Sequence, residues 1–253
     1  MITLQKLQKN KYLKRLPNME YKPQKRLLGI NNTKMLKSIE LGYLTAILHL
    51  APHKLSGVNI CPKASVGCAM ACLNTSGRGR FEFTQKSRLN KTYYFLKDRQ
   101  KFLLQLDNEI KNFKKRAIKK GLKPAVRLNG TSDLLFERYP IKDGKNIMEL
   151  NPDIIFYDYT KIKNRMTVEL PKNYHLTFSK SESNDNEIKE LLTTAFNIAV
   201  VFNGSLPKTY LNRKVIDGDI SDLRFLEPKG VIVGLSTKGI AKTDKTGFVV
   251  NVN

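Results

Sequence analysis

The chain has 253 residues, a length that suits one large α/β domain, and its hydrophobic content of 41% is ordinary for a globular protein. No apolar stretch is long enough to span a membrane, and the N-terminus lacks the apolar core and cleavage site of a signal peptide, so we expect a protein of the reducing cytoplasm. The formal net charge of +23 favours nucleic acid as a partner, although basic side chains scattered over a solvated surface would give the same value.

The first 40 residues are predicted to form a basic N-terminal arm. Lysine and arginine are frequent there, and Glu20 is the one acidic residue among the first 39 positions. Pro17 and Pro23 interrupt any long helix. We expect an extended arm that packs on a single α/β domain covering residues 41–253.

All three cysteines lie close together, after the first apolar run of strand length. That run is Tyr43–Leu50, and Cys61, Cys68 and Cys72 follow it with the spacing C-x6-C-x3-C. Because their number is odd and no secretory signal precedes them, we do not expect a disulfide bond. Thiolates are soft ligands, and three of them can hold a [4Fe–4S] cluster whose fourth iron is left for another ligand.

Two alternatives to a cluster remain open. A structural zinc site would need a fourth ligand, for which His49, His53 and His175 are the nitrogen donors in the chain. Cysteines that bind nothing are the other alternative, since cysteine is commonly a small buried hydrophobe. His53 is also a candidate fourth ligand of the cluster, although a histidine near a strand end more often hydrogen-bonds locally.

The segment after Cys72 combines turn residues with cations. Asn74–Gly79 contains two glycines, which let backbone amides approach a bound group. Arg78 and Arg80 are predicted to face an anion or to favour deprotonated thiols. An ordinary flexible connection explains the same residues equally well.

The rest of the chain alternates helical and strand-length patterns. Periodicity predicts a helix over 84–120, whose buried face carries Phe95, Phe102, Leu103, Leu106, Ile110 and Phe113, and a second helix over 186–195. Further apolar runs of strand length cover 125–128, 154–157, 174–178, 197–202, 215–216 and 231–235, with a last edge strand within 246–252. Such continuous runs are typical of parallel strands covered on both faces. Several connections are too short for a regular helix, so we expect a partial or irregular TIM-like (β/α) barrel with mostly parallel strands and the cysteine loop after the first strand.

Polar residues at the carboxyl ends of these strands are expected to meet the cysteines at one face of the barrel. The candidate catalytic residues are Asp133, Asp158, Lys161, Glu182, Asp217, Asp219 and Lys238, and the candidate substrate- or cofactor-binding residues are Asn129, Ser179, Arg78 and Arg224. Turns and helix caps account for some of them. Asp217 and Asp219 either bind a cation or a sugar hydroxyl, or form a charged turn with salt bridges to Arg213 or Arg224.

Five motifs carry a resemblance to a known family. They are Cys61–Cys68 with Cys72 and Gly77–Gly79, Val126–Asp133, Tyr157–Lys161, Leu176–Glu182 and Val215–Asp219. From about Asn32 to the C-terminus the chain resembles the gene-product-88 type of phage proteins, a family known mainly as a sequence pattern. The resemblance implies a phage-encoded protein in the host cytoplasm and implies little about its function.

The layout also resembles radical S-adenosylmethionine enzymes, whose three cluster cysteines sit on the loop after the first strand of a partial β/α barrel. This resemblance implies a [4Fe–4S] cluster at Cys61, Cys68 and Cys72, with S-adenosylmethionine as a further cofactor at the fourth iron. The chain departs from the usual C-x3-C-x2-C spacing, and Asn129–Ser132 stands where Gly-Gly-Glu would follow the second strand. A cluster is therefore better supported than radical chemistry.

Three functions follow from these patterns. The first is a radical-SAM-like or other iron–sulfur redox enzyme that acts on a small-molecule substrate. The second is a non-catalytic electron carrier or redox sensor, which needs an exposed cluster and a docking surface for a redox partner. The third is a basic nucleic-acid-binding protein with a structural metal site, whose affinity would fall steeply with salt. The motifs at strand ends favour the first two.

Overall fold

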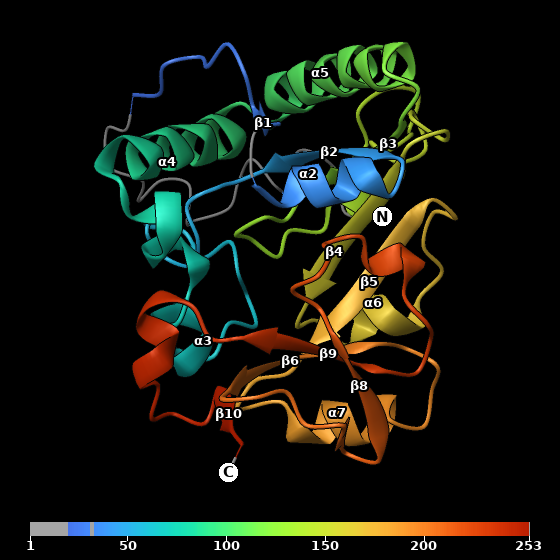
Figure 1. The fold of residues 1–253 in the computed structure, drawn as a ribbon. Coiled ribbons are helices and arrows are strands. Elements are labelled where there is room, and N and C mark those ends of the chain that lie inside the picture. Colours follow the sequence, from blue (N-terminus) through green and yellow to red (C-terminus); the bar gives the residue numbers. More distant parts are fainter. Residues whose placement is uncertain (1–19, 31–32, 253) are drawn as a thin grey trace.

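The computed structural model describes residues 20–30 and 33–252, within which ten strands form one sheet (Figure 1). The strands are β1 (Leu28–Gly29), β2 (Tyr43–Leu48), β3 (Lys123–Arg127), β4 (Ile155–Thr160), β5 (Tyr174–Ser179), β6 (Ile198–Asn203), β7 (Thr209–Tyr210), β8 (Arg213–Asp217), β9 (Ile232–Ser236) and β10 (Val249–Asn251). The helices are α2 (Thr33–Glu40), α3 (Val66–Met70), α4 (Glu82–Lys97), α5 (Arg99–Lys119), α6 (Asn164–Thr167) and α7 (Asp185–Leu191).

Most neighbouring strands run parallel, as the continuous apolar runs predict. The order across the sheet is β1-β2-β3-β4-β5-β6-β9-β8-β7, and β10 pairs with β6. Only β1 and β7 pair antiparallel with their neighbours. All six residues of β2 are buried, because helices and loops cover both faces of the strand.

The sheet is open, so the predicted TIM-like barrel is not confirmed. From β2 to β6 the strands follow sequence order, as they do in a barrel, but β9 then lies between β6 and β8. No ladder in the described chain joins the β1 edge to the β7 edge. A closed barrel is surrounded by a ring of helices, whereas β3 and β4 are followed only by the 3-10 turn Phe136–Arg138 and by the single-turn helix α6. The architecture is an open, mostly parallel α/β sheet.

The helix predicted over 84–120 is two helices. Asp98 interrupts it with an extended φ of −137°, and its carboxylate accepts a hydrogen bond from the Lys101 amide at 3.4 Å, which caps α5. The predicted buried face is confirmed, since Phe102 and Ile110 of α5 are fully buried and the helix packs on β2 and β3. In the described part of the chain, no helix is both long and apolar enough to cross a membrane.

Part of the segment assigned to the N-terminal arm packs tightly on the domain. The amides of Leu27 and Leu28 donate to the Glu109 carboxylate of α5 at 2.9 and 3.0 Å, and the Leu27 side chain is fully buried. Strand β1 and helix α2 also belong to this segment. Residues 1–19 lie outside the described structure.

Candidate functional site at the cysteine loop

The three cysteines come together on the loop that leaves the carboxyl end of β2. Cys61 lies in the loop, Cys68 lies in α3, and Cys72 follows that helix. Ser65 caps α3 by accepting a hydrogen bond from the Cys68 amide at 3.1 Å. All three thiols are free and half-buried, and the charges of Cys68 and Cys72 both act on Cys61. The three thiols therefore lie close enough to interact electrostatically.

Burial favours the protonated form of these thiols. Loss of hydration raises the pKa of all three, and that of Cys61 to about 12. Two backbone amides oppose this effect, because His53 donates its N–H to the Cys61 sulfur at 3.3 Å and Asn74 donates its N–H to Cys72. The Cys61 thiol itself donates to the Thr131 carbonyl at 3.7 Å.

Of the two cations beside the thiols, Lys161 was among the predicted site residues and Arg88 was not. Lys161 acts on Cys68 and Arg88 acts on Cys72, each lowering the thiol pKa. Arg88 comes from α4 and donates to the Asn74 side chain at 2.6 Å. Arg78 and Arg80 are exposed, and Arg80 lies over the ring of Phe81.

His53 contacts Cys61 through its backbone. Its φ of 51° lies in the left-handed region, which is uncommon for a residue other than glycine, and this turns its N–H toward the Cys61 sulfur. The contact that the structure gives His53 is thus a backbone hydrogen bond to the Cys61 sulfur, and its role as a fourth ligand stays a prediction.

Lys161 and Asp133 form a buried pair next to the thiols. The Lys161 ammonium donates to the Ser179 hydroxyl at 2.6 Å and to two backbone carbonyls, while its amide donates to Asp133 at 2.9 Å. Burial lowers the pKa of Lys161, and the negative charges of Cys68 and Asp133 act in the opposite direction. Burial raises the pKa of Asp133, which Arg165 counters through an ion pair of 2.8 Å.

Glu182 holds the start of α3 in place. Its carboxylate accepts from the Ser65 hydroxyl and from the Gly67 amide, both at 2.7 Å. Position 67 also requires glycine, because a Cβ there would lie 2.0 Å from Oγ1 of Thr246 and 2.5 Å from Cβ of Phe248. Helix α3, which carries Cys68, is therefore wedged between the loop after β5 and the segment before β10.

Asn129 and Asp158 hydrogen-bond to each other and support the turn that bears Asp133. Asp158 is fully buried inside β4, which extends beyond the predicted strand, and burial raises its pKa to about 6. It accepts hydrogen bonds from the Asn129 amide at 2.7 Å and from the Tyr174 hydroxyl at 2.9 Å. The Asn129 side chain accepts in turn from the Leu134 amide, which shapes the turn that bears Asp133.

The remaining predicted residues interact with one another at the ends of β8 and β9, and the segment that follows Lys238 packs on the turn after Cys72, where a Cβ at Gly239 would lie 2.8 Å from Cβ of Ser76. Lys238 pairs with Asp219 at 2.5 Å, and the Asp219 amide donates to the Asp217 carboxylate at 2.8 Å. Arg224 donates to the Gly218 carbonyl at 2.6 Å and pairs with Glu227. These contacts form a charged turn, with Lys238 as the salt-bridge partner of Asp219 where the alternative interpretation named Arg213 or Arg224.

His49, one of the three possible nitrogen donors for zinc, directly follows β2. Burial lowers its pKa to about 3, and the charges of Arg88, Arg127 and Lys91 lower it further. Its ring lies against Gly130, where a Cβ would come within 2.8 Å of the imidazole Cδ2. Its position after the apolar run of β2 was the available signal, but that signal does not distinguish a ligand from a core residue.

In the part of the chain that the structure describes, no three His, Cys, Asp or Glu side chains are arranged as ligands of one metal ion. Ligands of one zinc ion must converge on a single point, whereas three cysteines of a four-iron cluster bind three different irons. This arrangement supports neither the zinc nor the cluster alternative directly, and both stay predictions.

Comparison with known proteins gives one match. The family model described as Gene product 88 covers residues 20–252, a range that includes all three cysteines and begins within the segment assigned to the arm. No curated protein and no solved structure matches the chain.

Proposed function

The chain belongs to the gene product 88 family, and we propose that it is an iron–sulfur protein in which Cys61, Cys68 and Cys72 bind a [4Fe–4S] cluster. The proposal is supported by three free, half-buried thiols that interact electrostatically on the loop after the first parallel strand. Thiolates are the usual ligands of such clusters.

The donor set suits an iron–sulfur cluster. Two sulfurs accept backbone N–H groups, and such hydrogen bonds stabilise a thiolate and tune the potential of a cluster. Lys161 and Arg88 bring positive charge to the three anionic ligands. Ligation requires the cysteines to lose their protons, so binding would offset the cost of burying them as thiolates.

The neighbouring side chains have separable roles in this proposal. Glu182 orients α3 and with it Cys68, and Asp133 holds the backbone of Lys161. The Lys161 ammonium is in turn aimed at Ser179. When bound, the cluster would supply one-electron transfer and an iron open to a further ligand.

The first form of this function is a redox enzyme with a layout similar to that of radical S-adenosylmethionine enzymes. The cysteine loop follows β2, and β2 to β6 are parallel and in sequence order, as in the barrel of those enzymes. Lys161 and Ser179 would then position a small-molecule substrate. Asn129 is engaged with Asp158 and Leu134, so its side chain acts as frame rather than as a cofactor ligand.

The second form is an electron carrier, and an exposed apolar rim favours it. Val66, Met70 and Leu73 are 70%, 58% and 51% exposed, and they alternate with the cysteines along α3 and the turn after it. Exposed apolar side chains near a redox group are suited to brief docking of a partner.

Protein purified without oxygen tests the proposal. We expect about four irons and four sulfides per chain, with an electron paramagnetic resonance signal after reduction. Replacing Cys61, Cys68 or Cys72 by alanine should abolish the signal. A signal that changes on adding S-adenosylmethionine supports the enzyme, and an indifferent signal supports the carrier.

Asp133→Asn and Asp219→Asn form a matched pair for this experiment. Asp133 holds Lys161 beside the thiols, whereas Asp219 pairs with Lys238 at the ends of β8 and β9. We expect the first change to lower the iron content or shift the signal and the second to leave both unchanged. The proposal would be refuted if the protein contained zinc in place of iron, or if neither variant contained any metal.

A further inference from the structure

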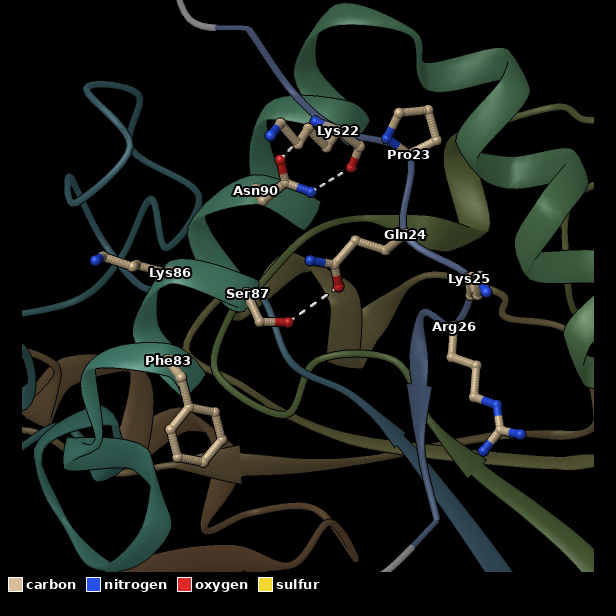
Figure 2. Close-up of a pocket in the computed structure, with 9 residues that line it drawn as sticks. All are labelled: Lys22, Pro23, Gln24, Lys25, Arg26, Phe83, Lys86, Ser87 and Asn90. Atoms are coloured by element: carbon tan, nitrogen blue, oxygen red, sulfur yellow. Dashed lines mark hydrogen bonds between the residues drawn. The ribbon is translucent and has the colours of Figure 1, made fainter.

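An open groove of about 830 Å³ lies between the extended segment of residues 22–26 and helix α4. Figure 2 shows the segment crossing the helix, with Lys25 and Arg26 on one wall and Phe83 and Lys86 on the other. The cysteine loop contributes none of the residues that line it. The groove is therefore a second feature, distinct from the proposed metal site.

Hydrogen bonds fix the two walls of the groove to each other. The Asn90 side chain accepts from the Lys22 amide at 2.8 Å and donates to the Lys22 carbonyl at 2.5 Å (Figure 2). The Ser87 hydroxyl donates to the Gln24 side chain at 3.0 Å. The segment thus lies on α4 in a defined register, which gives the groove a preformed shape.

The groove carries positive charge. Lys22, Lys25, Arg26 and Lys86 line it, all four are exposed, and no lining residue is acidic. Lys86 pairs with Glu82 at 2.6 Å, which leaves three cations on the opposite wall to meet an anion. Groups of exposed cations on one surface bind phosphate backbones through counterion release.

An aromatic platform stands at one end of the groove. Phe83 is 72% exposed, an unusual state for so large an apolar side chain. Its ring is stacked on that of Phe81, with centroids 5.9 Å apart and planes inclined by 11°, and the Arg80 guanidinium lies over the Phe81 ring. A ring that is exposed beside cations offers a stacking surface for an unpaired base.

We propose that this groove binds single-stranded nucleic acid. Lys22, Lys25 and Arg26 would contact phosphates, and a base would stack on Phe83. The platform favours a single strand over a duplex, because bases in a duplex are stacked on each other and offer no free face. This inference stands whether or not the cysteines bind a cluster.

Fluorescence anisotropy with labelled oligothymidylate and oligouridylate of about 20 nucleotides tests the proposal. We expect binding whose affinity falls steeply between about 50 and 200 mM salt and is weaker for a duplex of equal length. The sugar that is bound more tightly identifies the strand as DNA or RNA. Phe83→Ala should weaken binding about tenfold at fixed salt.

A matched pair of charge reversals separates the groove from diffuse charge. Lys25→Glu with Arg26→Glu should weaken binding at least about tenfold and flatten the salt dependence. Lys115→Glu with Arg116→Glu changes the net charge equally on the exposed face of α5 and should have a much smaller effect. Circular dichroism establishes that each variant is folded. Equal losses in the two double variants, tighter binding of duplex, or no binding by the unaltered protein would overturn the inference.

Discussion

At the scale of single residues, the site is defined by thiols that burial keeps protonated. Cys61 lies between the His53 amide and the Thr131 carbonyl, and its pKa is raised to about 12. The thiolate is the reactive form of cysteine, so a raised pKa lowers reactivity at neutral pH. The same burial makes these residues poor nucleophiles in the metal-free protein.

Alkylation of metal-free protein by iodoacetamide measures this property. At pH 8 we expect Cys61 to react at least about tenfold more slowly than free cysteine, because its raised pKa leaves less thiolate. The rate should continue to rise above pH 9, where free cysteine is already largely ionised. Site-resolved mass spectrometry gives the rates. A Cys61 rate equal to that of free cysteine would contradict the arrangement described above.

Asp158 gives a second prediction at this scale. Its pKa of about 6 lies above the usual value of 3.8, so the folded protein binds a proton there before the unfolded chain does. As the pH falls from 7 to 4, this group should therefore add stability, by about 1–3 kcal/mol. Denaturant unfolding of the wild-type protein and of Asp158→Asn at both pH values measures the effect. From pH 7 to pH 4, the free energy of unfolding of the wild type should rise relative to that of Asp158→Asn. If the difference in unfolding free energy between the two proteins is the same at both pH values, protonation of Asp158 does not contribute to stability.

At the scale of elements, helix α3 depends on close packing. Gly67 meets Thr246 and Phe248 at distances that leave no space for a methyl group. We expect Gly67→Ala to destabilise the protein by about 1–3 kcal/mol, because overpacking displaces the helix. It should also reduce the iron bound per chain, because Cys68 lies on the same helix.

Gly29→Ala is the control for that substitution. A Cβ at position 29 would find the Ile47 carbonyl at 3.5 Å, which is an ordinary contact. We expect this variant to bind iron as the unaltered protein does and to unfold at a similar denaturant concentration. If both alanine variants behaved alike, the close packing around α3 would not be what holds the site.

The boundary between α4 and α5 is a further element that can be tested. Asp98 caps α5 and also accepts a hydrogen bond from the Tyr21 hydroxyl at 3.3 Å. Asp98→Ala should lower the free energy of unfolding by about 1 kcal/mol, a typical cost for a lost N-cap. Asp98→Asn retains a capping side chain and should cost less. Denaturant unfolding compares the two variants.

At the scale of the whole molecule, the large positive net charge should determine how thermal stability depends on salt. A net charge of +23 repels itself, and salt screens that repulsion. We expect the melting temperature to rise as sodium chloride is raised from about 50 to 500 mM. A melting temperature that falls over this range would mean that specific ion pairs such as Lys163–Glu190 outweigh the general repulsion.

Most parallel strands of this fold were predictable because burial on both faces leaves continuous apolar runs in the sequence, whereas the two-residue strands β1 and β7 were not predicted. The end of β4 was not predictable, because Asp158 and Thr160 are polar residues that are nevertheless buried. Their partners, Tyr174 and Asp133, lie elsewhere in the chain. The open edge and the placement of β9 between β6 and β8 depend on long-range pairing, which local patterns do not carry.

The candidate site was predictable in part. Asp133, Lys161, Ser179 and Glu182 follow parallel strands, whose carboxyl ends meet at one edge, and the structure brings them to the cysteines. Asp217, Asp219, Arg224 and Lys238 obey the same pattern but belong to strands farther along the sheet. Arg88 was overlooked because it lies on a helix with many basic residues, where sequence alone does not show which one turns inward.

The wedging of α3 also has a consequence for the order of events during protein synthesis. Cys61, Cys68 and Cys72 leave the ribosome early, but Thr246 and Phe248, which confine the helix between them, are added long afterwards. Throughout that interval the thiols belong to a loop without its final packing partner. Loading of iron would thus be a late event, completed on chains whose distal segment has already docked.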